Sequence, residues 1–184
     1  MHNYTIRLAW QTLAALVLFA PYSLSQTSEA QEIQIVLDPD ASLLTINSLP
    51  FTSGITVEDI LNEFGEPDSI QSYREGERSY VYERFGLVVG TIADEIKVLG
   101  ITFTDDGDKH FARTPFTGSL RIGGTEVTAL TQPDTFQEMK NPAFVCQTIM
   151  CAGASNGENT LKIMAGFTGG EKNKLTQIAF LIDG

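Results

Sequence analysis

The residues of this sequence that could carry out a reaction are few. Beyond residue 25 the chain holds one histidine, His110, so any Ser–His or Cys–His couple would depend on it alone. No G-x-S-x-G, H-E-x-x-H or phosphate-binding glycine loop occurs. Adjacent carboxylates such as Asp94 with Glu95 receive acid and base roles only from their arrangement in space. The sequence therefore predicts a protein that is not an enzyme and uses no cofactor.

An acidic segment, residues 104–110, comes nearest to a metal-binding pattern. It collects Asp105, Asp106 and Asp108, and carboxylates are ligands that Ca²⁺ prefers. The segment lacks the ligand spacing and the closing glutamate of an EF-hand loop. We interpret it as a polar turn between two halves of the chain, and we expect no metal site.

The two cysteines, Cys146 and Cys151, are predicted to form a disulfide. The N-terminal residues indicate export, as argued below, and thiols in an oxidising compartment normally pair. Because four residues separate the cysteines, the bond would hold a hairpin or a strand edge more than it would stabilise the whole fold. A C-x4-C pair without further cysteines or nearby histidines cannot complete the four ligands of a zinc site.

Tyrosine and arginine side chains gather between residues 73 and 84. The candidate partner-binding residues are Tyr73, Arg74, Arg78, Tyr80, Tyr82 and Arg84. Side chains alternate between the two faces of a strand, so an expected strand over residues 79–85 places the last three of these on one face. Val81, Glu83 and Phe85 then share the face expected to pack on a helix.

Two interpretations of this region remain open. Tyrosine and arginine are enriched at the anchor positions of protein interfaces, which favours a docking surface. The two tyrosines could equally cover the solvent side of a sheet. In the same way, the charged hairpin over residues 73–78 is either a recognition loop or an ordinary solvated turn.

The charge of the chain excludes some partners. The formal net charge of the whole chain is −11. Arg7 is the only lysine, arginine or acidic residue before position 26, so the residues beyond position 25 carry 11 basic and 23 acidic side chains, a net charge of −12. Such a surface should repel nucleic acid and anionic lipid. The acidic balance either keeps an exported protein soluble or steers a basic partner into contact.

The N-terminus has the pattern of a secretory signal peptide. One positive charge, Arg7, precedes an apolar run over residues 13–20, followed by Pro21 and the small residues Ser23 and Ser25. The run is well short of the roughly 20 apolar residues that a membrane-spanning helix needs. We expect residues 1–25 to be removed after Ser25, or a few residues later after Ala30. The remaining chain should be periplasmic or secreted, without stable membrane insertion.

Periodicity beyond the signal peptide predicts short strands and one clear helix. Thr56 is a candidate N-cap with Asp59 three residues later, and apolar residues then recur at helical spacing until Gly65 and Pro67 end the helix. Strand patterns cover residues 33–37, 42–46, 69–73, 79–85, 87–92 and 96–104. The first half of the chain therefore reads as a hairpin, a helix and a meander.

The sequence then repeats this order. The residues Thr56, Asp59 and Pro67 have counterparts 75 positions later, and Ile101 and Phe103 have counterparts 77 positions later at Ile178 and Phe180. We predict an internal duplication with units over residues 31–110 and 111–184. The expected fold class is α+β, with two tandem similar units, each with one helix packed on an antiparallel β-meander.

The stretches FGEPD at residues 64–68 and SYVY at residues 79–82 resemble the repeats of the β-lactamase inhibitory protein. The outer-membrane assembly lipoprotein family BamE (SmpA/OmlA) has a related pattern. The second half keeps Pro142, but Asn141 replaces the glycine and no Tyr-x-Tyr follows. The resemblance implies a curved antiparallel sheet that is presented to a partner. Tandem copies of such units also occur in predicted bacterial immunity proteins.

These observations lead to one expected function and two alternatives. The first is an exported protein-binding inhibitor or immunity protein that neutralises a secreted or periplasmic effector or enzyme. Its partner would be a protein, for example a basic secreted toxin or enzyme, because the chain is acidic. The second is an assembly or scaffold module of the cell envelope, and the third is an uncharacterised hydrolase.

Overall fold

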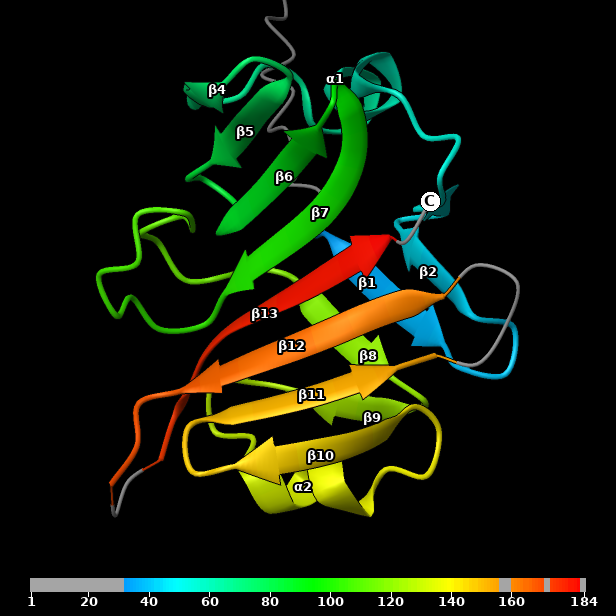
Figure 1. Ribbon diagram of the computed structural model, residues 1–184, viewed down its shortest axis with the longest axis vertical. Coiled ribbons are helices and arrows are strands. Elements are labelled where there is room, and N and C mark those ends of the chain that lie inside the picture. Colours follow the sequence, from blue (N-terminus) through cyan, green and yellow to red (C-terminus); the bar gives the residue numbers. More distant parts are fainter. Residues whose placement is uncertain (1–31, 156–159, 171–172, 183–184) are drawn as a thin grey trace, which may run out of the picture. The chain divides into compact units, whose positions relative to one another are not determined.

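The computed structural model describes residues 32–155, 160–170 and 173–182, which form two β-sheets and two short helices (Figure 1). Strands contain 48% of the described residues and helices 10%. The expected α+β class is therefore wrong, because the described part of the chain is predominantly β. The expected signal peptide, with its cleavage after Ser25 or Ala30, lies outside the described residues.

The smaller sheet is built from the hairpins that open the two halves of the chain. Its strands are β1 (Gln34–Asp38), β2 (Leu43–Ile46), β3 (Leu49–Pro50), β8 (Ser119–Ile122) and β9 (Thr125–Val127). Their order is β3-β2-β1-β8-β9, and β1 runs parallel to β8 while the other neighbours are antiparallel. The two opening hairpins therefore share one sheet and do not extend two separate meanders.

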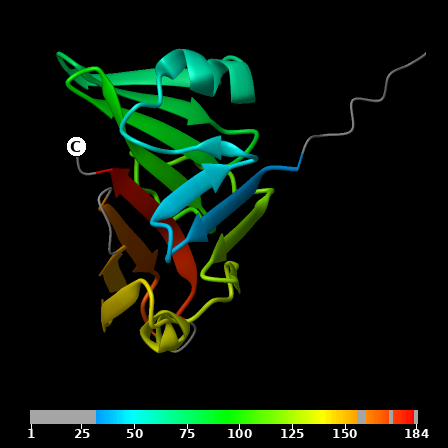
Figure 2. The ribbon, with the colours of Figure 1, turned by 90° about the vertical axis from the view of Figure 1, so that its right-hand side faces the viewer.

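The larger sheet joins two four-stranded meanders. Its strands are β4 (Ser69–Arg74), β5 (Glu77–Tyr82), β6 (Leu87–Ile92), β7 (Glu95–Thr102), β10 (Ala143–Gln147), β11 (Met150–Ala154), β12 (Leu161–Phe167) and β13 (Leu175–Ile182). All neighbours are antiparallel in the order β10-β11-β12-β13-β7-β6-β5-β4. The smaller sheet lies against one face of the larger, and the turned view separates the two layers (Figure 2).

The order of elements recurs in the two halves. Each half runs through a hairpin, a helix and a meander, and the two meanders meet where β7 pairs with β13. Ile101 and Ile178, which the 77-residue spacing relates, lie directly opposite each other in that pair. Both halves contribute to one hydrophobic core between the sheets. The duplication itself stays a prediction.

The first helix, α1 (Val57–Phe64), follows the local signals closely. Thr56 is its N-cap, and the reciprocal hydrogen bonds between Thr56 and Asp59 form a capping box. Ile60 and Phe64 are buried against the core, and Gly65 ends the helix with a positive φ of 73°. Glycine tolerates this conformation because it has no β-carbon.

The second helix, α2 (Pro133–Glu138), is shorter and less well capped. Its N-cap is Gln132, whose side chain makes no capping hydrogen bond. Thr131, the expected counterpart of Thr56, lies one residue earlier and accepts a hydrogen bond from the backbone N–H of Thr128 at 2.9 Å. Six residues with Phe136 as the single buried side chain cannot cover a sheet. The second half is therefore held by sheet packing rather than by its helix.

Replacing Thr56 with alanine is expected to lower the free energy of unfolding by about 1 kcal/mol at neutral pH, because an N-cap side chain is lost. The hydrogen bonds from Thr56 hold the pKa of Asp59 below its ordinary value. The stabilisation linked to Asp59 is therefore present above the ordinary carboxyl pKa and is lost as the pH falls through the lowered pKa. Urea unfolding should show a smaller difference between parent and variant at about pH 2 than at about pH 6. An equal difference at both pH values would contradict the role given to Asp59.

The predicted disulfide is confirmed. Cys146 on β10 and Cys151 on β11 lie directly opposite each other with Cα atoms 3.9 Å apart, and they are bonded. The link joins the outermost strand of the larger sheet to its neighbour. It therefore holds the edge of the sheet, as its short spacing in the sequence predicts.

Replacing both cysteines with alanine is expected to lower the free energy of unfolding by about 2 kcal/mol, because the bond closes only a short loop. Reduction of the parent protein should have a similar effect. Urea unfolding with and without a reducing agent measures both, and the double variant should not respond to the reducing agent. A loss of about 5 kcal/mol would show that the bond stabilises more than this sheet edge.

Candidate docking surface

The two tyrosines expected at a docking surface lie in the hydrophobic core. Tyr80 is 8% exposed and Tyr82 is fully buried. The ring of Tyr82 lies 5.3 Å from that of Phe64 on α1, so this face of β5 packs on the helix. The expected exposure of these tyrosines is therefore wrong. The opposite face of β5 is also covered, since Val81 is 2% exposed. This strand therefore has no solvent-facing side with polar residues to set it apart from a buried apolar side.

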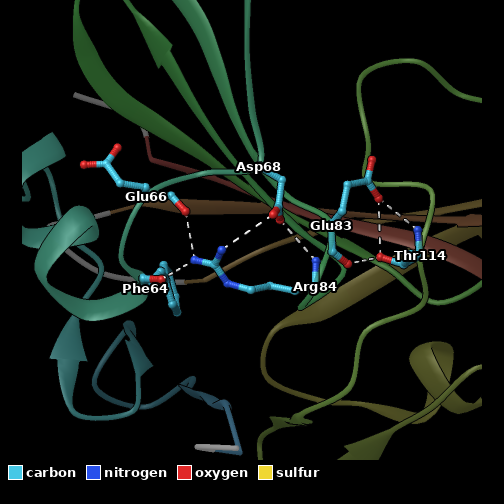
Figure 3. Close-up of polar contacts among 6 residues, drawn as sticks. All are labelled: Phe64, Glu66, Asp68, Glu83, Arg84 and Thr114. Atoms are coloured by element: carbon cyan, nitrogen blue, oxygen red, sulfur yellow. Dashed lines mark hydrogen bonds and ion pairs between the residues drawn. The ribbon is translucent and has the colours of Figure 1, made fainter.

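Arg84, expected beside the tyrosines on the same strand, lies in the turn after β5 and binds the end of α1 (Figure 3). Its Nη2 atom donates to the carbonyl oxygens of Phe64 and Glu66 at 2.5 and 2.8 Å. Its Nη1 atom lies 3.5 Å from a carboxylate oxygen of Asp68. These carbonyls lie at or beyond the C-terminus of the helix, where a positive charge is favourable. Arg84 therefore stabilises the C-terminal end of α1.

Glu83, the neighbour of Arg84, holds the segment that follows β7. Its carboxylate accepts hydrogen bonds from the backbone N–H groups of Arg113 and Thr114 at 2.8 and 3.2 Å. The hydroxyl of Thr114 also donates to the carbonyl oxygen of Glu83 (Figure 3). The turn after β5 thus connects the end of α1 on one side with residues 103–118 on the other.

The charged hairpin between β4 and β5 makes its own contacts. The ring of Tyr73 lies 5.0 Å from that of His110, and its hydroxyl donates to Gln71 at 2.8 Å. Arg74 pairs with Glu77, and Arg78 lies 3.9 Å from a carboxylate oxygen of Asp94. This arrangement fits a solvated turn. Partner binding by Tyr73, Arg74 and Arg78 stays a prediction.

Replacing Arg84 with alanine is expected to lower the free energy of unfolding by about 1 to 2 kcal/mol, because two helix-end carbonyls lose a charged donor. Lysine should recover only part of this loss, since a single ammonium lacks the fork of the guanidinium. Arg121, an exposed arginine on β8, is the matched control, and Arg121→Ala should change stability little. Equal losses in the two alanine variants would contradict the role of Arg84.

The outer face of the larger sheet, opposite the smaller sheet, carries a continuous apolar row. Residues that lie directly opposite one another on successive strands form this row. In order from β10 to β5 they are Val145, Ala152, Met164, Ala179, Gly100, Val88 and Val81. Apolar residues on a sheet face are normally covered by another layer.

Residues 103–118 cover one part of this row. A β-carbon added at Gly100 would lie 2.9 Å from the ring of Phe111, so the ring rests on that glycine. Ala112 packs with Val81 and Val88 in a small buried cluster, and its carbonyl accepts a hydrogen bond from Thr102 at 2.8 Å. The part of the row on β5 to β7 is therefore closed off from solvent.

The remaining part of the row is open. We define the docking face as Val145, Met150, Ala152 and Met164 together with Ile149 in the turn between β10 and β11. Val145 is 75% exposed and Met164 is 42% exposed. Residues 141–157 include no charged residue in a chain that has 35 lysine, arginine, aspartate and glutamate residues. Depletion of charge around exposed apolar side chains is typical of the core of a protein interface.

Two hollows adjoin at Met164 on this face. The larger, of about 680 Å³, lies between residues 106–111 and the β10–β11 turn. The smaller, of about 480 Å³, lies along β10 to β13 and includes Val145, Ala152 and Leu181. The face is therefore shaped as well as apolar, so side chains of another molecule could enter it.

Comparison with known proteins places the chain in a family. A family described as a domain of unknown function (DUF7738) matches residues 36–137, more than half of the chain. The chain belongs to this family. The matched residues end within α2, so the docking face lies beyond them.

Other comparisons add little. No curated protein matches the chain. A solved structure of a cysteine-rich secretory protein from Staphylococcus aureus is similar at 15% identity with a TM-score of 0.36. The similarity covers 71% of this chain and 43% of that one, so the chain spans less than half of that protein's length. A likeness of this size establishes neither fold nor function.

The structural findings about metals and membranes concern the described residues only. Within residues 32–155, 160–170 and 173–182, no group of three or more histidine, cysteine or acidic side chains could hold a metal ion. Asp105, Asp106 and Asp108 instead accept hydrogen bonds from nearby backbone N–H groups. No helix in this part of the chain is long and apolar enough to cross a membrane.

Sequence reasoning missed the exposed apolar side chains of this face, although the sequence holds one signal of them. The run over residues 141–157 has no charged residue and contains the two cysteines. We therefore interpreted this run only as the site of a disulfide. The alternation of exposed and buried residues along β10 puts Val145 outside and Phe144 inside. An exposed valine in an uncharged run is the feature that could have marked this face.

Proposed function

We propose that this is an exported protein that binds another protein through the docking face, as an inhibitor or immunity protein. The observation that carries the proposal is the open half of the apolar row. The chain covers one half with its own residues 103–118 and leaves Val145, Ala152 and Met164 open. A partner that covers these side chains would gain the free energy of burying them.

The charges of the protein support a basic partner. The residues beyond position 25 carry a net charge of −12. Among the described residues that line the larger hollow, the charged side chains are Asp106 and Asp108. A positively charged protein would therefore be drawn to the molecule at a distance and would meet complementary charge at the larger hollow, whereas the charged residue that lines the smaller hollow is Lys162.

Two further features support export and inhibition. The Cys146–Cys151 disulfide fits an oxidising compartment outside the cytoplasm. The resemblance of residues 64–68 and 79–82 to repeats of the β-lactamase inhibitory protein adds the proposal that the partner is an enzyme or toxin. Such a partner should lose activity when it is bound.

Capture followed by mapping tests this function. The immobilised protein is used to capture partners from envelope and secreted fractions, and a candidate is then purified and its activity measured with and without this chain. Hydrogen exchange should show protection of β10 to β12 in the complex, because a bound partner covers these strands. A control measurement on the free protein sets the baseline.

Two results would contradict the proposal. Protection confined to the β4–β5 hairpin would move the contact to Tyr73, Arg74 and Arg78. Failure to recover any protein whose binding protects β10 to β12 would remove the docking function itself. A captured partner that belongs to an envelope assembly machine and keeps its activity would favour the scaffold alternative over an inhibitor.

A further inference from the structure

The larger hollow on the docking face has one side of uncharged residues and one acidic side. Its floor is formed by the outer residues of β12 and β13, including Met164 and Gln177, and one wall is the β10–β11 turn with Ile149. That turn is held in place, because its Ile149 carbonyl accepts a hydrogen bond from the backbone N–H of Phe167 at 2.9 Å. The opposite wall is formed by Asp106, Asp108 and Phe111.

The carboxylate of Asp108 is anchored at this wall by two hydrogen bonds. One oxygen accepts the backbone N–H of His110 at 2.9 Å, and the other accepts the side-chain amide of Gln177 at 3.5 Å. Gln177 extends from β13 on the floor of the hollow. These hydrogen bonds hold the carboxylate of Asp108 over the sheet.

An occupant of this hollow has to satisfy both sides at once. The floor and the turn offer Met164 and Ile149 to an apolar stem, and Phe111 offers an aromatic ring. The two aspartates offer negative charge to a cationic head at the other side. Lysine and arginine combine an apolar stem with a cationic end, and both interact favourably with an aromatic ring.

We propose that the larger hollow receives a lysine or arginine side chain of the partner, with its cationic end at Asp106 and Asp108. This inference rests on the proposed function, and it specifies the side chain by which a basic partner is recognised. The apolar row then supplies the buried area, while the hollow selects for positive charge.

A small cation tests the hollow without the partner. Pentylammonium, which reproduces the stem and head of lysine, is titrated into the ¹⁵N-labelled protein, with pentanol and pentanoate as neutral and anionic matches. We expect saturable shifts of the amides of Gly107, Phe111, Gly166 and Gln177, with a dissociation constant on the order of 10 mM. Pentanol should bind more weakly and pentanoate more weakly still.

Charge-matched variants decide whether the aspartates are responsible. Asp106→Asn with Asp108→Asn should weaken pentylammonium binding about fivefold, because two screened ion pairs are lost. Glu75→Gln with Glu126→Gln removes the same charge from exposed positions outside the hollow and should leave binding unchanged. Each variant's amide spectrum also reports whether the fold is intact.

Several outcomes would overturn the inference. Equal binding of pentanoate and pentylammonium, or shifts centred on another surface, would show that the hollow does not select a cation. Shifts at Asp106 and Asp108 with calcium chloride alone, and none with pentylammonium, would assign the segment to a metal. Partner capture that depends on Val145 and Met164 but not on the two aspartates would reject the cationic contact while the proposed docking function stands.

Discussion

A double variant with lysine in place of Val145 and Met164 is expected to bind the captured partner at least about 100-fold more weakly than the parent protein. The two side chains sit in one cross-strand row, separated by Ala152 on β11. Lysine at both positions would put two ammonium groups where the partner's apolar surface has to close, and burying an unpaired charge is costly. The loss should appear mainly as faster dissociation, measured by surface plasmon resonance.

Matched positions elsewhere provide the control for this variant. Leu130 is 74% exposed and Ile92 is 48% exposed, close to the values of Val145 and Met164, and both lie outside the docking face. Leu130→Lys with Ile92→Lys adds the same charge to equally exposed apolar sites. If the two double variants weaken binding equally, the effect comes from net charge and the docking face is the wrong surface.

Replacing Tyr82 with alanine is expected to lower the free energy of unfolding by about 3 to 5 kcal/mol. The side chain is fully buried and contacts the rings of Phe64 and Phe85, with centroids 5.3 and 6.5 Å away. Truncation would therefore leave a cavity between α1 and β5. Urea or thermal unfolding measures the loss, and a Tyr73→Ala variant on the exposed end of β4 should lose much less. A small loss for Tyr82→Ala would contradict the core position of this ring.

Phenylalanine at position 82 separates the ring from its hydroxyl. In the described part of the structure the buried Tyr82 hydroxyl has no hydrogen-bond partner, so Tyr82→Phe should be neutral or stabilise by about 1 kcal/mol. Burial raises the pKa of Tyr82 to about 12, mainly because the phenolate would be desolvated.

This raised pKa also sets an alkaline limit to stability. Because the folded protein holds the Tyr82 proton more tightly than the unfolded chain does, the associated stability is fully present below the ordinary tyrosine pKa of about 10. It is lost as the pH rises from about 10 to about 12. Tyr82→Phe should lack this part of the alkaline loss. The absorbance of tyrosinate against pH should likewise show one titration step removed by the variant.

Local signals in the sequence determined several elements of this protein. The capping box at Thr56 and the glycine at position 65 depend only on residues within one helix, and α1 begins and ends there. Cys146 and Cys151 are close enough in the chain to meet across one hairpin, so their pairing was also predictable. The order of hairpin, helix and meander in the first half followed from the same short-range patterns.

Only the tertiary structure decided which faces are covered. The α+β expectation assumed that each helix covers its own meander. The opening hairpins instead pair through β1 and β8 and form a second sheet over the core. Such pairing joins residues about 85 positions apart, as in Ile35 with Leu120, and leaves no mark on the local pattern of either strand.

The candidate site shows the same division between sequence and structure. The sequence by itself determined that Tyr80 and Tyr82 alternate with Val81, because a strand has a period of two. It did not determine that both sides are buried, because residues 103–118 return to cover Val81 while α1 covers Tyr82. Val145 and Met164 are exposed for the converse reason, since no described segment crosses their part of the sheet. Whether a side chain of the larger sheet is buried depends on which segment, distant in the sequence, packs on its face. The tertiary structure determines that packing.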